Sequence, residues 1–226
     1  MLRWLALGGM TALLVGAVAC TETPEPAHDD GIQLIKSRAK AGDAEAQYQL
    51  GVAYTNGQGV PQDFVEMVGW FRKSAEQGHA EAQSNLGLSY GLGRGVPQND
   101  VEATVWYRRA AEQGHARAQF NLGVKYASGV GVPQDDVEAA AWYRQAAEQG
   151  DVNAQSNLGL LYVDGKGVSQ DDVEAYKWFD IAAALDDTTK SLSVAMRDHR
   201  RSLMTVEQIT EGERLVHEWF AVHPRE

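Results

Sequence analysis

The chain has 226 residues, of which 23% are charged and 44% apolar, a composition typical of an ordered soluble protein. Its formal net charge is −11. Nucleic acid is excluded as the expected partner, because phosphate binding needs a clustered basic surface, and Arg and Lys are here dispersed among Asp and Glu.

The first element along the chain has the pattern of an export signal. Arg3 precedes an apolar run that ends at Ala19. That run is too short for a comfortable membrane span of about 20 residues, and its small-residue end predicts a signal peptide over residues 1–19. Cys20 follows directly, and the segment resembles the lipobox of bacterial lipoproteins. The resemblance implies a lipid on Cys20, facing the periplasm; the alternatives are simple secretion after cleavage and an uncleaved anchor.

Residues 20–31 contain that cysteine and then a polar, acidic, proline-bearing stretch, which predicts a flexible tether. A single cysteine permits no intramolecular disulfide, so packing alone must hold the fold. Residues 32–43 look like the second half of the repeat that follows, with Leu34 in the position of its tryptophan. We therefore expect an N-terminal capping helix there.

A repeat of 36 residues fills the centre of the chain. A tryptophan, a glycine and a tyrosine each recur at this spacing, as does a Gly-x-Gly-Val motif. The units cover residues 44–79, 80–115, 116–151 and 152–187, with their tryptophans at Trp70, Trp106, Trp142 and Trp178. Self-similarity at this period indicates a solenoid, in which each unit packs only on its neighbours.

Each unit reads as two helices joined by a glycine-rich loop. In the second unit, apolar or small residues recur every three or four positions from Ala82 to Tyr90. The second helix opens with Asn99, a short polar residue that caps helices, and Glu102 follows three positions later, as in a capping box. Gly114 ends that helix. The recurring tryptophans are expected to lie between helices, in the core.

Segments such as AEAQYQLGVAYTNGQGVPQD and ARAQFNLGVKYASGVGVPQDDVEAAAWYRQAAEQG closely resemble Sel1-like repeats. This resemblance covers residues 44–187. It implies an all-α fold: a right-handed α-solenoid of four 36-residue helix-turn-helix units, related to tetratricopeptide repeats, with a concave inner face. Residues 188–226 resemble the C-terminal capping helices of such proteins, and Thr205 with Gln208 predicts a capping box at the start of the last one.

Several motifs resemble catalytic or ligand-binding patterns without their structural context. Gly87 to Gly91 matches the G-x-S-x-G elbow around Ser89, but the motif falls inside a repeat helix rather than on a strand-to-helix turn. His217 and His223 are six residues apart, which does not fit a zinc helix. His79 and His115 occupy one repeated position and are interpreted as helix caps. The sequence thus predicts no enzyme activity, no cofactor and no metal.

Positions that differ between units are free to recognise a partner. By analogy with tetratricopeptide repeats, the first helix of each unit lines the concave face, which would present an apolar floor with a polar rim. The predicted contact residues are Tyr48, Val52, Glu81, Ser84, Leu88, Arg117, Phe120, Val124, Asn153 and Leu160. We expect a protein- or peptide-binding scaffold of the bacterial cell envelope. The alternative is a hydrolase or binding module that acts on peptidoglycan or a β-lactam.

Overall fold

The computed structural model describes residues 28–185 and 190–224, which form eleven helices and no strand. α1 (His28–Lys40) precedes four helix pairs, and α10 (Lys190–Arg201) and α11 (Val206–Val222) follow them. The pairs are α2 (Ala44–Asn56) with α3 (Phe64–Glu76), α4 (Ala80–Leu92) with α5 (Asp100–Glu112), α6 (Ala116–Ser128) with α7 (Asp136–Glu148), and α8 (Val152–Asp164) with α9 (Asp172–Leu185).

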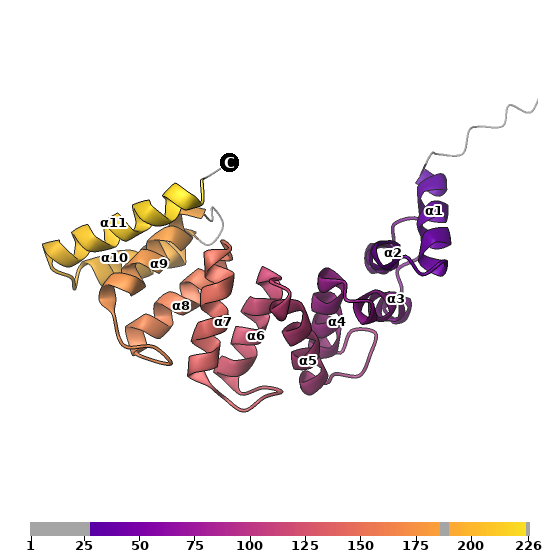
Figure 1. Ribbon diagram of the computed structural model, residues 1–226, viewed down its shortest axis with the longest axis horizontal. Helices are drawn as coiled ribbons and strands as arrows, with labels where there is room; N and C mark the ends of the chain where they lie inside the picture. Colours follow the sequence, from indigo (N-terminus) through magenta and orange to yellow (C-terminus); the bar gives the residue numbers. More distant parts are fainter. Residues whose placement is uncertain (1–27, 186–189, 225–226) are drawn as a thin grey trace, which may run out of the picture.

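Successive helices pack against one another along the chain, and Figure 1 shows them following an arc with α1 and α11 at its two ends. Each pair coincides with one 36-residue unit of the sequence. The predicted all-α solenoid of four repeats is therefore confirmed.

Short polar side chains start the second helix of each repeat. The Asp63 carboxylate accepts hydrogen bonds from the backbone N–H groups of Val65 (2.8 Å) and Glu66 (3.1 Å), which have no partner within the helix. The same cap is formed in the later repeats by Asn99, Asp135 and Asp171.

In the third and fourth repeats, the glutamate three residues after the cap has a different role from the predicted one. A capping box would have it accept from the backbone of the cap residue. Instead, Glu138 accepts a hydrogen bond from the indole N–H of Trp142, and Glu174 accepts one from Trp178, each at 3.1 Å. Because these pairs are one helical turn apart, the glutamate fixes the tryptophan of its own helix.

A column of glycines allows the two helices of each repeat to approach closely. A Cβ atom placed on Gly123 would lie 2.6 Å from Cδ1 of the Tyr143 ring, well inside van der Waals contact. The same contact recurs for Gly51 with Phe71, Gly87 with Tyr107, and Gly159 with Phe179. Burial of the Tyr107 ring raises the pKa of its hydroxyl to about 12. The aromatic side chain of the second helix therefore packs on the bare backbone of the first.

A series of buried glutamines connects one repeat to the next. Gln83 donates from Nε2 to the carbonyl of Ala75 (3.0 Å) and accepts from Nε2 of Gln113 (2.7 Å). The same pair of bonds is formed around Gln47 and Gln119. Leu185 occupies the equivalent of Gln113 in the fourth repeat, and Oε1 of Gln155 is buried there without a partner among the described residues. The series of hydrogen bonds stops at that repeat.

The recurring tryptophans lie in the core, as predicted, but at different depths. Trp178 is 1% exposed and Trp106 is 7% exposed. Trp70 and Trp142 are half-buried and pack against core clusters of neighbouring helices. Their role is structural in each repeat.

The N-terminal cap differs from the prediction in two respects. α1 begins at His28, inside the segment 20–31 that was assigned to the tether. Ile32, rather than Leu34, supplies its core contact, since a Cβ on Gly59 would lie 3.0 Å from Cβ of Ile32. Leu34 is 60% exposed, because none of the described helices precedes α1 to cover that side.

The C-terminal cap follows the prediction closely. The Thr205 side chain accepts from the backbone of Gln208, and the Gln208 side chain accepts from the backbone of Thr205, which completes the capping box of α11. α11 packs on α9, where Gly212 lies directly against the Tyr176 ring. Trp219 is buried in the same interface. The apolar end of the fourth repeat is thereby covered.

The predicted signal peptide (1–19) and Cys20 lie outside the described residues. Among the helices that the structure describes, none is both long and apolar enough to span a membrane.

Candidate functional site

The residues predicted to contact a partner lie on the first helices of the repeats, α2, α4, α6 and α8. We call the surface that these residues form the first-helix face. Its exposed members are Glu81, Arg117, Asn153, Val124 (37% exposed) and Leu160 (38% exposed). Its half-buried members are Tyr48, Val52, Leu88 and Phe120. The face therefore offers apolar side chains of intermediate depth, with polar groups beside them.

Ser84 is the one predicted contact residue that is buried, and its assignment to the binding surface is wrong. Its side chain is 4% exposed, so it is not available for direct contact with a partner. Tyr48 and Phe120, at the equivalent positions of the first and third repeats, are long enough to reach the surface. Serine is too short, and the neighbouring atoms cover it.

A pocket of about 120 Å³ opens on the first-helix face between the first and second repeats. Its apolar lining comes from α2, α3 and α4, through Val52, Met67, Phe71, Leu88 and Leu92. Asn85 and Arg94 add polar groups to the lining. Two of the predicted contact residues, Val52 and Leu88, therefore share one concave site.

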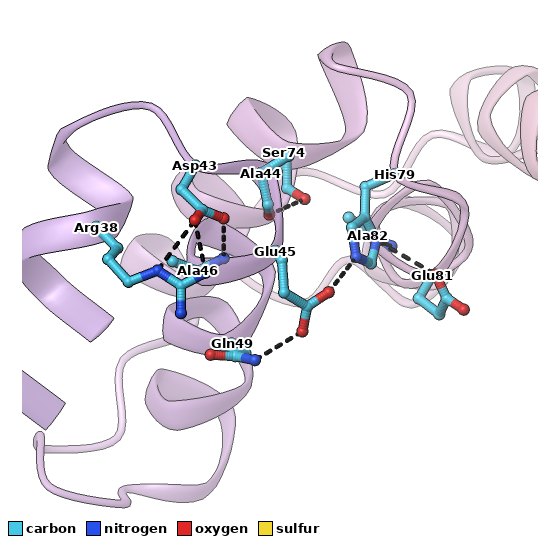
Figure 2. A network of polar contacts seen from close by, with 10 residues as sticks. All are labelled: Arg38, Asp43, Ala44, Glu45, Ala46, Gln49, Ser74, His79, Glu81 and Ala82. Carbon is cyan, nitrogen blue, oxygen red and sulfur yellow. Dashed lines mark hydrogen bonds and ion pairs between the residues drawn. The ribbon is translucent and has the colours of Figure 1, made fainter. Parts of the chain in front are cut away.

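Polar contacts at the junction of these two repeats border the same face (Figure 2). The imidazole of His79 pairs through Nε2 with the Glu45 carboxylate (2.9 Å), while Nδ1 lies 3.3 Å from the Glu81 carboxylate. Nδ1 also accepts from the backbone N–H of Ala82 (3.3 Å), which caps α4. The His79 ring stacks on Tyr48, with 4.8 Å between ring centroids. The predicted role of His79 as a cap is confirmed.

The equivalent position caps the first helix of the later repeats as well. Nδ1 of His115 accepts from the backbone N–H of Ala118 (3.1 Å), and the Asp151 carboxylate accepts from Ala154 (2.8 Å). Burial lowers the pKa of His115, and the nearby Glu81 carboxylate opposes that shift. The neutral form of His115, which accepts the bond, is therefore favoured in the folded chain.

An amide column on the first helices was missed in the sequence. Asn85 lines the pocket, and Asn121 and Asn157 occupy the same half-buried position in the next two repeats. The signal was present, because these three residues recur at the 36-residue spacing. An amide both donates and accepts hydrogen bonds, as does a peptide main chain.

The residues that resembled catalytic motifs have ordinary structural roles. The Ser89 hydroxyl is 4% exposed and donates to the carbonyl of Asn85 one turn earlier in α4. His223 contacts the carbonyl of Trp219 through Nδ1 (2.9 Å), and its ring stacks on that indole. Within the described residues, no group of three or more potential ligands could hold a metal ion.

Comparison with known proteins identifies the repeats. The Sel1 repeat family model matches residues 44–79, 80–115, 116–151 and 152–187. A crystal structure of a Sel1 repeat protein from Oxalobacter formigenes is 37% identical, with a TM-score of 0.61, over 69% of this chain and 68% of that one.

A second solved structure is c5321, a protective antigen of uropathogenic Escherichia coli strains that displays an SLR fold. It is 30% identical, with a TM-score of 0.57, and the match covers 85% of this chain and 49% of c5321. This chain therefore spans about half the length of c5321. No curated protein is similar enough to count as a relative.

The stacked helix pairs define a helical-repeat protein, an α-solenoid. The chain belongs to the Sel1 repeat family. Sel1 repeat proteins are generally protein-interaction scaffolds, and their fold is typically non-catalytic.

Proposed function

We propose that this protein is a non-catalytic scaffold of the bacterial cell envelope, and that it binds a segment of a partner protein on the first-helix face. The observation that carries the proposal is the pocket between α2 and α4, which is lined by apolar side chains at varied repeat positions. Half-buried apolar groups with a polar rim are typical of protein-binding surfaces.

The shape of the site favours an extended segment over a folded domain. The first helices are successive units of an array, so Asn85 and Asn121 offer amide groups one repeat apart, whereas the Asn157 side chain bonds to Tyr143. Apolar side chains lie beside these amides: Leu88 in the second repeat and Phe120 in the third. A segment with its main chain exposed can use both kinds of contact at once.

Location in the envelope is part of the proposal and rests on the N-terminal sequence. The apolar run before Ala19 and the single cysteine directly after it support export and acylation of Cys20. Two or more acyl chains anchor a protein stably, since each buried CH₂ contributes about 0.8 kcal/mol. The membrane would then be contacted through the lipid, which leaves the repeats free to bind a protein.

The test is a double variant on α6, Arg117→Glu with Val124→Ser, in quantitative capture of envelope proteins by the lipidated protein. Both side chains are exposed, so the fold should tolerate the changes. Phe120 is less suitable, because its ring packs 5.9 Å from that of Tyr143 and its truncation would also lower stability. We expect at least about a fivefold loss of the captured partner. Truncation of a hot-spot residue near the centre of an interface costs more than about 1 kcal/mol of binding free energy.

A matched control changes one valine and one cation away from the first helices, as Val101→Ser with Lys40→Glu. Val101 is 60% exposed on α5, and Lys40 is exposed at the end of α1. This variant has the same net charge as the α6 variant and should keep the partner. Equal capture by wild type and the α6 variant, with both proteins folded, would refute α6 as part of the binding site.

A further inference from the structure

The lining of the pocket between α2 and α4 includes a repeat position that differs in every repeat. Ser89 of α4 lines the pocket, and its equivalents are Ala53, Lys125 and Leu161. Lys125 extends from α6 to the Asp100 carboxylate (2.6 Å), and Leu161 is 9% exposed within the core. The later junctions thus hold a longer side chain at this position, whereas serine is short.

The size and lining of the pocket suit one apolar side chain. Its volume of about 120 Å³ is below the roughly 300–1,000 Å³ of small-molecule sites. Met67 and Phe71 of α3 line it together with Val52 and Leu88 of the first helices. Met67 and Phe71 are 2% and 3% exposed, so the second helix supplies a part of the lining that belongs to the core.

Charge distinguishes the two ends of the surface around the pocket. Arg94, in the loop after α4, lines the pocket and lies over the Phe64 ring, 5.2 Å from its centroid. Glu45 and Glu81 lie in the first turns of α2 and α4, at the opposite ends of those helices. Seven residues, or about 10 Å of helix, separate each glutamate from the pocket residue on its own helix, Val52 or Leu88. Arg94 therefore has the larger effect on an anionic group beside the pocket.

We propose that this pocket is a specificity site for a single apolar side chain flanked by acidic residues in an extended partner segment, with Arg94 pairing a neighbouring carboxylate. The inference rests on the proposed function and names the chemistry of the partner. The apolar anchor enters between α2 and α4, where Leu88 and Val52 contact it. The Asn85 amide, on the pocket wall, bonds to the main chain beside the anchor.

The probe for the test is a fluorescein-labelled, C-terminally amidated peptide, Gly-Ser-Asp-Leu-Asp-Ser-Gly, with its Asn-Leu-Asn and Asp-Ala-Asp counterparts. Binding to the full-length protein in mild detergent is followed by fluorescence anisotropy. The chain itself supplies the variants. Ser89→Leu introduces the residue found at position 161 and fills the pocket, whereas Ser89→Ala introduces the residue found at position 53 and keeps it open.

We expect Ser89→Leu to weaken binding of the Asp-Leu-Asp peptide at least tenfold, and Ser89→Ala to leave it within twofold of wild type. The Asp-Ala-Asp peptide should bind wild type at least tenfold more weakly, because most of the buried apolar side chain is lost. Replacing Asp by Asn in the peptide should weaken its binding to wild type by up to about fivefold and should leave its binding to Arg94→Gln unchanged. The effect is small because Arg94 is exposed and ion pairs of exposed groups are weak. Lys166→Gln, at the equivalent loop position of the fourth repeat, serves as the charge control.

The proposal is overturned if the Asp-Leu-Asp peptide does not bind wild type at millimolar concentration. It is also overturned if folded Ser89→Leu binds like wild type, or if the Asn peptide binds as tightly as the Asp peptide. Partner capture separates this failure from that of the proposed function. Loss of the partner in the α6 variant but not in Ser89→Leu would reject the pocket alone, whereas full capture by both variants would reject the first-helix face.

Discussion

The close approach of the two helices at the glycine column predicts the effect of adding a single methyl group. In Gly123→Ala, the new Cβ would meet two atoms of the Tyr143 ring at 2.6 and 2.7 Å. Overpacking of this kind costs about 1–3 kcal/mol, and the better helix propensity of alanine returns about 1 kcal/mol. We therefore expect a net loss of about 1 kcal/mol in the free energy of unfolding.

Gly69→Ala is the matched control. Gly69 also lies inside a helix, but a Cβ there meets nothing within 4 Å, and other repeats hold Val105 and Ala141 at this position. This change should stabilise the protein by about 0.5–1 kcal/mol. At roughly 2–4 °C per kcal/mol, the two variants should differ by about 3–8 °C in Tm, measured by circular dichroism at 222 nm. A Gly123→Ala protein that melts as high as Gly69→Ala would refute the close-packed glycine column.

Three further outcomes follow. Trp106→Ala should lower the free energy of unfolding by about 3–5 kcal/mol in urea titrations, because the 7% exposed indole fills the core; wild-type stability would place it on the surface. Burial holds the pKa of His115 below its ordinary value near 6.5, so the unfolded chain binds more protons. Tm should thus decrease as pH falls below about 6.5. His115→Asp should weaken this dependence of Tm on pH, since Asp151 caps the fourth repeat without a histidine. An equal change of Tm with pH in both proteins would contradict this explanation. Cys20→Ser should move the protein from the detergent phase to the aqueous phase of a Triton X-114 partition; unchanged partition would refute lipidation.

The repeat architecture was predictable because identical packing recurs at a fixed spacing. The glycine that meets an aromatic ring within a repeat, such as Gly87 with Tyr107, recurs in all four repeats, so the contact leaves a regular pattern in the sequence. The caps at His79 and His115 were predictable for the same reason, as they share a position with Asp151. The buried face of α1 was harder to predict. Leu34 and Ile32 are both apolar, and only three-dimensional packing shows which of them is covered.

The site was less predictable because it depends on differences between repeats. Ser84 was assigned to the surface from its position, but the burial of a short side chain depends on the size of its neighbours. The pocket escaped prediction because it depends on how α2, α3 and α4 pack together, and an unfilled space has no pattern in a sequence. Arg94 lies in a glycine-rich loop, and its place in the pocket lining appears only once α3 and α4 are packed.

Site-specific photocrosslinking in intact cells tests the central claim most directly. A photoreactive residue in place of Leu88, in the pocket lining, is compared with one in place of Val101, which is 60% exposed on the second helix of the same repeat. Binding on the first-helix face predicts a discrete crosslinked partner from position 88 and none from position 101. A partner crosslinked from position 101 alone would place the binding surface on the second helices and contradict the account.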